Sequence, residues 1–368
     1  MISAPHQPTL DDTNKLLLAL SKKVRTALDQ KDYSTAKSLV ERVLSIAPKH
    51  STAWCDLAFV EIRLNEYESG YQHAMNALAF SKAPIDPNIY DILTEVCAES
   101  KRYEEMRYYG RLAIQSKKQQ VADQLLPVAT FAQRPQSISP DRRQNIISYS
   151  LFGDQARYCE VAVLNAKLAK SIYPEWTCRF YLDDSVPNEI VDRLQDEGAE
   201  IIRMDSTNSK FSGLFWRFLV IDDPQVHCFI IRDADSLLSY KERAAVDAWL
   251  ASDKWFHCMR DSYSHSELIL AGMWGGFHGA LRNIQQDIDQ FLSSKFIANR
   301  TIDQQFLRRI IWSQIAHSCL THDSTSYDVD SAPFPDYQLS EIEKTPGFHI
   351  GMIDSCFTTL IHIEDPQA

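Results

Sequence analysis

The chain has 368 residues, of which 45% are hydrophobic and 24% are charged, and its formal net charge is -11. This length and apolar content are sufficient for two or three domains with cores of their own, and they exclude a chain that is disordered throughout. The negative charge, without any basic stripe interleaved with aromatic residues, argues against nucleic acid or an anionic membrane as the main partner.

The N-terminal stretch and the cysteines bear on the compartment. MISAPHQPTLDDTNK lacks the charged start and apolar run of a signal peptide. No uninterrupted apolar stretch approaches the roughly 18–20 residues that cross a bilayer, so we expect no integral membrane segment. The eight cysteines are scattered without a C-x-x-C pair, which favours reduced core thiols over a structural zinc site. We therefore expect a cytoplasmic protein.

The first third of the chain repeats one pattern. Tyr33, Tyr67 and Tyr103 stand 34 and 36 residues apart, and each precedes small or apolar residues at helical spacing, such as Gly70. Small residues let two helices approach, while the Tyr fills the wedge between neighbours. This pattern resembles the tetratricopeptide repeat, a helix–turn–helix of about 34 residues, and predicts such a domain over 13–122. The alternative is an unrelated bundle of α-hairpins.

The remainder of the chain has a different pattern. Residues 123–145 lose the helical periodicity and contain three prolines, which indicates a linker. Strand-like and helical segments then alternate, which predicts a mostly parallel sheet covered on both faces over 146–368. The strand-like segments are 146–152, 178–184, 199–204, 227–233, 254–261 and 267–276, and the helical ones are 155–174, 186–198 and 236–252.

One strand-like segment ends in paired carboxylates. The stretch FIIRDADS places Asp233 and Asp235 directly after three large apolar residues. Ligands of such sheets bind in the crevice at the carboxyl ends of the strands. Two carboxylates one residue apart can chelate Mg²⁺ or Mn²⁺, and the metal would then bind a diphosphate and act as a Lewis acid on the leaving group. The alternative is structural, with Asp235 or Ser236 capping the following helix.

Six stretches of the second region carry a family resemblance. They are ISYSLFG (147–153), FWRFLVIDD (215–223), RDADS (232–236), FHCMRDSYSH (256–265), ILAGMWGG (269–276) and TIDQQFL (301–307). Together they resemble a GT-A glycosyltransferase, a Rossmann-like fold that binds nucleotide sugars through a D-x-D motif and a metal. We therefore expect α-helical repeats followed by a GT-A-like, mostly parallel α/β domain.

The resemblance implies an enzyme. It would transfer a hexosyl or N-acetylhexosaminyl group from a UDP- or GDP-sugar, with Mn²⁺ or Mg²⁺, to a protein, peptide or glycan acceptor. The repeats would recruit the acceptor in part, or else mediate homodimerisation. The chain has no H-x-x-G-x-x-K-P-W ending, although FHIG (348–351) supplies a His and a Gly at a comparable place, and no inverting Glu-Asp pair is recognisable. Retention or inversion therefore stays open.

The same resemblance assigns roles to individual residues. Asp233 would contact the metal and the ribose, and Asp235 would bind the metal firmly. Arg217 would hold its helix and the donor. Asp303 and Gln304 would face the donor sugar, with Asp303 as a catalytic residue.

Further site residues are expected from their chemistry. His322 in LTHDS and His349 in FHIG compete as a third metal ligand, since imidazole combines well with two carboxylates. Asp261 and His265 flank a loop and would serve the acceptor as a base or hydrogen-bond partner, unless the segment is a simple turn.

A glycine-rich stretch adds a sugar contact. Gly272 would let the backbone approach the sugar, and Trp274 would stack on its apolar face. The alternative is a tight bend beside a core Trp.

Two other functions compete with the transferase. DADSLL also fits the D-x-D-x-small-Leu pattern of haloacid-dehalogenase-type phosphatases, in which the first Asp is a nucleophile, but that motif normally follows the first strand of its domain. The chain could also be a repeat adaptor with an inactive transferase domain, although such a protein has no need of an intact carboxylate pair.

Overall fold

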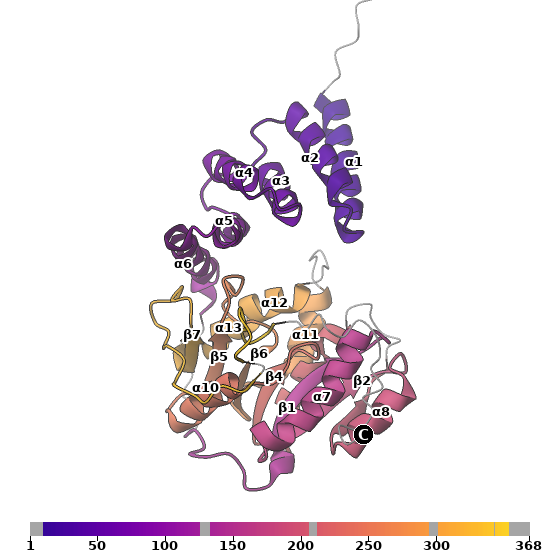
Figure 1. Cartoon of the computed structure of the whole chain (residues 1–368), viewed down its shortest axis with the longest axis vertical. Helices are drawn as coiled ribbons and strands as arrows, with labels where there is room; N and C mark the ends of the chain where they lie inside the picture. The colour runs from indigo at the N-terminus through magenta and orange to yellow at the C-terminus, as the bar shows by residue number, and fades with distance from the viewer. Residues whose placement is uncertain (1–9, 126–132, 206–211, 294–300, 342, 353–368) are drawn as a thin grey trace, which may run out of the picture. The chain divides into compact units, whose positions relative to one another are not determined.

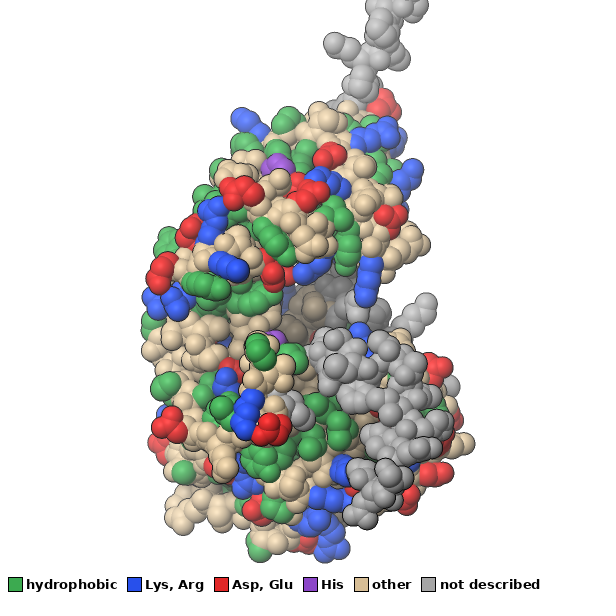
Figure 2. All heavy atoms as spheres, viewed as in Figure 1, with side chains coloured by type: hydrophobic (Ala, Val, Ile, Leu, Met, Phe, Trp, Pro, Cys, Tyr) green, Lys and Arg blue, Asp and Glu red, His purple; other side chains and the backbone are tan. Residues whose placement is uncertain are grey.

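The computed structural model describes residues 10–125, 133–205, 212–293, 301–341 and 343–352. The chain forms two compact units, Met1–Lys117 and Lys118–Ala368 (Figure 1). None of the described helices is both long and apolar enough to cross a bilayer. On the face drawn in Figure 2, basic and acidic side chains lie interspersed, and the described side chains form no extended basic area there.

The first unit consists of helix hairpins stacked in chain order. Its helices are α1 (Leu10–Asp29), α2 (Tyr33–Ile46), α3 (Ser51–Arg63), α4 (Tyr67–Phe80), α5 (Pro87–Glu99) and α6 (Tyr103–Gln120), the last of which runs past the boundary at Lys117. The three repeat tyrosines are the first residues of α2, α4 and α6. The predicted repeat architecture is therefore confirmed.

Small residues and tight turns explain the hairpins. Ala36 and Ala77 are fully buried, and a side chain at Gly70 would lie 3.4 Å from the Ala58 carbonyl oxygen of the facing helix. Each hairpin turns through a residue with positive φ two positions before its Tyr, at 57°, 63° and 60° for Lys31, Asn65 and Lys101. This left-handed conformation ends the first helix and reverses the chain.

The second unit is built on a seven-stranded sheet. Its strands are β1 (Asn145–Leu151), β2 (Thr177–Leu182), β3 (Glu200–Arg203), β4 (Cys228–Arg232), β5 (Phe256–Arg260), β6 (Met273–Phe277) and β7 (Cys319–Asp323). Their order is β3-β2-β1-β4-β6-β5-β7. β6 is antiparallel to both of its neighbours, and all other pairs are parallel. The predicted mostly parallel sheet is confirmed, but β7 lies in no predicted strand and 267–272 are not strand.

Helices cover both faces of this sheet, as predicted. In β1, Ser148 donates a hydrogen bond to η4 (Trp216–Asp222), a 3₁₀ helix on one face. The next side chain, Tyr149, points to the other face and stacks on Phe180 of β2 with ring centroids 4.7 Å apart. Figure 1 shows α7 (Ala156–Ile172) lying across β1 and β2, with α10 (Tyr240–Ala251) near β5.

The winding direction of the sheet reverses at β1. The chain leaves β1 for β2 and β3 on one side and then returns to place β4 on the other side of β1. Where the winding direction reverses in this way, the connections diverge and leave a crevice at the carboxyl ends of the two strands. Because β4 ends at Arg232, Asp233 and Asp235 follow at this edge.

The predicted linker 123–145 stays a prediction, and its central residues lie outside the described ranges. Its later part packs on the sheet unit through Arg134. This guanidinium donates to the Lys254 carbonyl oxygen at 2.8 Å and stacks over the Phe277 ring at 4.4 Å.

Candidate functional site

The backbone of Arg217 is held against β1. Ser148 donates from Oγ to the Arg217 carbonyl at 2.7 Å, and the Arg217 N–H donates to Ser150 Oγ at 3.0 Å. Alternate residues of a strand point to the same face. Ser148 and Ser150 can therefore bind the backbone carbonyl and the backbone N–H of Arg217 at the same time. This contact determines where the Arg217 side chain begins.

The Arg217 guanidinium then joins two elements. It donates to Asp233 Oδ1 after β4, and to Asp303 Oδ2 in α12 (Ile302–Phe306) at 2.9 Å. The Arg217 and Asp303 side chains are buried, whereas that of Asp233 is 42% exposed. One guanidinium thus orients the exposed carboxylate, and the expected contact of Arg217 with the donor stays a prediction.

Asp303 is held on both oxygens. Its Oδ1 accepts the Gln304 N–H at 2.9 Å, and its Oδ2 accepts from Arg217. Burial raises the pKa of Asp303, and the negative charge of Asp233 raises it further. The positive charge of Arg217 opposes this rise. The arrangement makes Asp303 a positioning residue for Arg217. The expected contacts of Asp303 and Gln304 with a sugar stay predictions.

Gly272 gives the Asp233 carboxylate its space. A Cβ at Gly272 would lie 2.1 Å from Asp233 Oδ2 and 2.8 Å from the Asp233 backbone N, both closer than atoms can approach. Any other residue would displace the carboxylate. The glycine is therefore required here for Asp233, whereas its predicted contact with a sugar stays a prediction.

Asp235 carries a poorly neutralised charge. It is only 9% exposed, and its carboxylate makes no hydrogen bond to another described residue. Burial, and then the charge of Asp233, raise the pKa of Asp235 to about 6, with Arg157 and Arg217 opposing the rise only in part. A cation bound between the two carboxylates would stabilise the ionised form.

The capping alternative for this motif is wrong. Ser239 is the N-cap of α10, and its Oγ accepts the Glu242 N–H at 3.2 Å. The intervening loop is pinned by Asn165 of α7, whose side chain binds Ser236 O and Leu238 N, each at 2.9 Å. Neither Asp235 nor Ser236 therefore caps the following helix.

His322 does not lie near the carboxylates. It is in β7 at the sheet edge, which β5 and β6 separate from β4. Three strand spacings correspond to about 14 Å. The His322 ring is instead hydrogen bonded through Nδ1 to Nε2 of His257 at 2.8 Å, and burial lowers its pKa to about 4. Its predicted role as a metal ligand is wrong, because the topology places it three strands away.

His349 packs against His265. The two rings meet edge to face, with centroids 5.4 Å apart. Burial lowers the pKa of His265 to about 3; His349 and Arg260 lower it further, while the nearby charge of Asp233 raises it. Within the described residues no three His, Cys, Asp or Glu side chains come together to hold a metal. His349 therefore does not complete a three-residue site in this structure.

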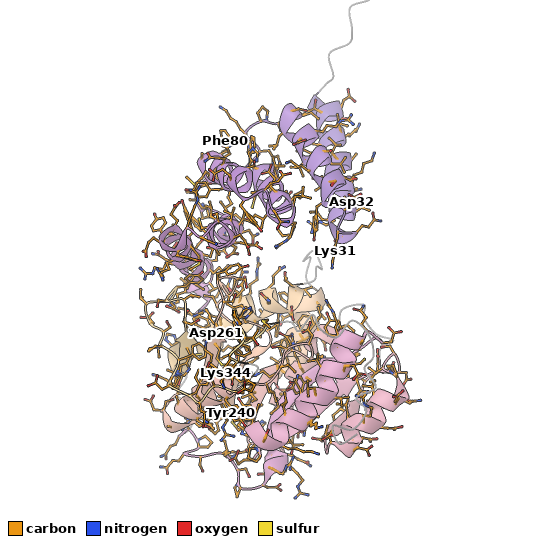
Figure 3. All side chains as sticks on the ribbon, viewed as in Figure 1. Lys31, Asp32, Phe80, Tyr240, Asp261 and Lys344 are labelled. Atoms are coloured by element: carbon orange, nitrogen blue, oxygen red, sulfur yellow. The ribbon has the colours of Figure 1, made fainter. Side chains whose placement is uncertain are left out.

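Asp261 is locked rather than available as a base. Its Oδ1 accepts from Lys241 Nζ at 2.5 Å, and its Oδ2 accepts the Ile350 N–H at 2.8 Å. The side chain, labelled in Figure 3, is 1% exposed. A carboxylate with both oxygens occupied and no contact with solvent cannot accept a proton from an acceptor. The catalytic role predicted for Asp261 is corrected to that of an anchor for 349–351.

Trp274 is a core residue. Its exposed fraction is 0%, and its ring packs against Phe218 and Phe229 at centroid distances of 6.1 and 5.7 Å. No ring face remains for a sugar, so the predicted stacking is wrong and the core alternative holds.

Sequence reasoning missed the residues that act at a distance. Ser148 and Ser150 clamp Arg217, and Asn165 pins the loop after the motif. Two serines at alternate positions of a buried strand were the available signal, because buried hydroxyls need partners.

The chain was compared with known families, curated proteins and solved structures. A scan against known families finds no match, and no curated protein matches. A solved structure of the Sgt2 TPR domain from Aspergillus fumigatus is similar at 20% identity and a TM-score of 0.26, over 31% of this chain and 72% of that one.

Two further solved structures are similar at comparable scores. A mutant O-GlcNAc transferase from Thermobaculum terrenum has 16% identity and a TM-score of 0.32, over 61% of this chain and 47% of that one. The 4-diphosphocytidyl-2C-methyl-D-erythritol synthase from Anaerococcus prevotii has 10% identity and a TM-score of 0.33, over 49% and 86%. These scores are too low to add to what the hairpins and strand order show.

Proposed function

We propose that the protein is a metal-dependent glycosyltransferase that moves a sugar from a nucleotide sugar to an acceptor. The observation that carries this proposal is the pair Asp233 and Asp235 at the reversal point of the sheet, with charge that the protein leaves partly unneutralised. A sheet of this kind binds ligands at that edge. A nucleoside diphosphate needs a cation between its phosphates and two carboxylates.

The residues present fit Mn²⁺ or Mg²⁺. Asp233 is exposed and oriented, and Asp235 is buried without a hydrogen bond to another described residue, its charge only partly offset by Arg157 and Arg217. Hard oxygen ligands suit both ions, which commonly use one or two carboxylates together with phosphate oxygens and water. When bound, the metal would supply charge stabilisation for the departing diphosphate.

The chain's own residues would prepare that site. Arg217 orients Asp233, Asp303 holds Arg217 from the opposite side, and Gly272 leaves the room that the Asp233 carboxylate occupies. Such preorganisation reduces the reorganisation that substrate binding would otherwise require. Asp233 and Asp235 would bind the metal, while Arg217 and Asp303 would act through Asp233.

A thermal-shift screen tests the proposal. UDP- and GDP-sugars would be added with and without Mn²⁺, because a ligand that binds only the folded protein raises the Tm. We expect one nucleotide sugar to raise the Tm only with Mn²⁺, and Asp235→Ala to remove this effect. An aspartyl-phosphate at Asp233 would instead establish the phosphatase, and a protein that binds no nucleotide would be an adaptor.

We further propose that the repeat unit recruits the acceptor. Two adjoining cavities of about 430 and 280 Å³ lie along α1, α3 and α5, and both are lined by Thr52 and Asp56. Phe59 lines the second. An extended segment of a protein acceptor would suit such a surface. Phe59→Ala should slow transfer to the acceptor and leave hydrolysis of the nucleotide sugar unchanged; equal loss of both would contradict this role.

A further inference from the structure

A histidine beside the carboxylates has one ring nitrogen without a partner. His265 is 9% exposed, and its Nδ1 accepts the backbone N–H of Asp261 at 2.9 Å. Because Nδ1 is the acceptor, the ring hydrogen of the neutral imidazole is on Nε2. Within the described part of the chain, this Nε2–H donates to no other group. A hydrogen-bond donor that the described residues leave without a partner is available to a ligand.

Gly351 lies beside the Nε2 edge of His265. A Cβ at Gly351 would lie 3.5 Å from His265 Nε2, 3.4 Å from its Cε1 and 3.1 Å from Met273 Sδ. Gly351 also has a φ of 83°, which other residues rarely adopt. The segment is held in place by Asp261, which accepts the N–H of the preceding Ile350. Asp261 therefore holds both parts of this edge. Its backbone N–H binds the His265 ring, and its carboxylate binds the residue before Gly351.

The same contacts connect this edge to the carboxylates. Gly272 touches Asp233, and the next residue, Met273, pairs in register with Arg232 and lies against Gly351. The charge of Asp233 also acts on the His265 ring. The Nε2–H of His265 is thus next to the proposed metal and diphosphate site. The sugar of a bound nucleotide sugar would lie there.

The neighbouring histidine offers the complementary group. His349 Nδ1 is 3.0 Å from the Ile350 carbonyl oxygen, which can only accept, so Nδ1 carries the hydrogen. In neutral His349 the lone pair is therefore on Nε2. A donor and an acceptor on adjacent rings match a hydroxyl, which both accepts and donates, whereas an ionised phosphate oxygen only accepts.

We propose that His265 recognises one hydroxyl of the transferred sugar by donating its Nε2–H, with His349 as the complementary acceptor. This inference rests on the proposed function and adds a specificity-determining residue to it. The role is that of a fixed hydrogen-bond donor, and it differs from the base or acceptor contact expected from the sequence.

Two matched substitutions separate the donor from the structural contact. His265→Asn keeps an acceptor for the Asp261 N–H but removes the donor at the Nε2 position. His265→Gln places an amide N–H near the Nε2 position. Calorimetry with Mn²⁺ would measure each variant's affinity for the nucleotide sugar found in the screen and for its nucleoside diphosphate without the sugar. Since both ligands need the same folded protein, the ratio of the two affinities does not depend on how much of a variant is folded.

We expect His265→Asn to weaken the nucleotide sugar about tenfold and leave the nucleoside diphosphate unchanged, with His265→Gln closer to wild type. A nucleotide sugar that lacks the recognised hydroxyl should bind both wild type and His265→Asn equally weakly. Equal weakening of both ligands would place His265 at the phosphates and overturn the inference, and so would no weakening of either. A wild-type protein that binds neither ligand would instead overturn the proposed function.

Discussion

Two strands of the sheet end in carboxylates, and the two ends differ in what neutralises the charge. After β5, Asp261 is met by an ammonium and a backbone N–H, and its side chain is closed to solvent. After β4, Asp233 shares one guanidinium with Asp303, and Asp235 binds no described residue through a hydrogen bond. The carboxylate after β5 is thus fully hydrogen bonded within the protein, whereas the negative charge after β4 is only partly neutralised.

This difference teaches how an acid at a strand end should be interpreted. Both ends have a buried strand followed by Asp in the sequence, so pattern alone treats them alike. The energetics separate them, because a buried carboxylate that is fully hydrogen bonded stabilises the fold, while one without partners destabilises it until a ligand binds. The same substitution, Asp to Asn, should therefore have opposite effects at the two ends.

The largest effect is expected at Asp235. Asp235→Asn should abolish Mn²⁺-linked nucleotide binding, a loss of at least about 100-fold, because one of two metal carboxylates is gone. It should also stabilise the metal-free protein. The pKa of Asp235 is raised to about 6 in the folded state. Ionisation therefore destabilises the fold as pH rises from about 4 to 6, by up to about 3 kcal/mol.

Urea unfolding of the metal-free protein at pH 8 and pH 4 measures this. The gain from Asp235→Asn should be present in full at pH 8 and small at pH 4, where the carboxyl is protonated in the folded state and about half protonated in the unfolded chain. Asp253→Asn, at an exposed position, is the control. A variant that is less stable than wild type at pH 8 would mean that Asp235 has a structural partner after all.

The opposite sign is expected at Asp261. Asp261→Asn should destabilise the protein by about 3 kcal/mol, because Lys241 loses its counter-charge in a mostly buried place. Lys241→Met in the same chain should recover part of the loss, since it removes the unpaired ammonium. Denaturant unfolding of the two single variants and the double variant gives the coupling. Additive effects would show that the pair is not energetically linked.

The hairpin architecture of the helical unit could be predicted from the sequence. Its signals are local: the Tyr that starts each second helix, and the small residues that follow it at helical spacing, act within one hairpin of the chain. The strands were also predictable where they are buried and apolar. β7 was missed because CLTHD is short and its last three residues are all polar, so neither alternation nor a long apolar run marks it.

The site was predictable only in part, because its contacts join distant residues. The D-x-D and its Arg could be placed from the motif, but Ser148 clamps a residue 69 positions later and Asp261 binds one 89 positions later. His322 and His349 looked equivalent in the sequence. Only the strand order separates them, since it places one at the far edge of the sheet and leaves the other beside His265.

A smaller, pH-dependent effect is expected from the buried pair of His257 and His322. Burial lowers the pKa of His322 to about 4, below its usual value of 6.5. The unfolded chain therefore takes up this proton first, and stability is lost as pH falls from about 6.5 to 4. The loss between pH 7 and pH 5 amounts to about 2 kcal/mol.

Chemical unfolding at the two pH values checks this assignment. His322→Gln should reduce the loss of stability between pH 7 and pH 5 by about 2 kcal/mol. The loss due to His257 should remain. His317→Gln, at an exposed position, is the matched control. Because His322 lies three strands from β4, neither variant should change Mn²⁺-linked nucleotide binding; a loss of Mn²⁺ dependence in His322→Gln would overturn its exclusion from the site.

The smallest effect is expected at the turns of the helical unit. Lys101 has a φ of 60°, a conformation that is unfavourable for a residue with a side chain but free for glycine. Lys101→Gly should therefore stabilise the protein by about 1 kcal/mol or less. Asn65→Gly, at the equivalent turn with a φ of 63°, should gain less, because Asn tolerates the left-handed conformation better than Lys does. Thermal unfolding measures the change in stability of both variants. Neither variant should change Mn²⁺-linked nucleotide binding, because the substituted residues lie in the repeats. Asp235→Asn, by contrast, should change both stability and binding. Equal gains at the two turns would show that side-chain identity does not determine their strain.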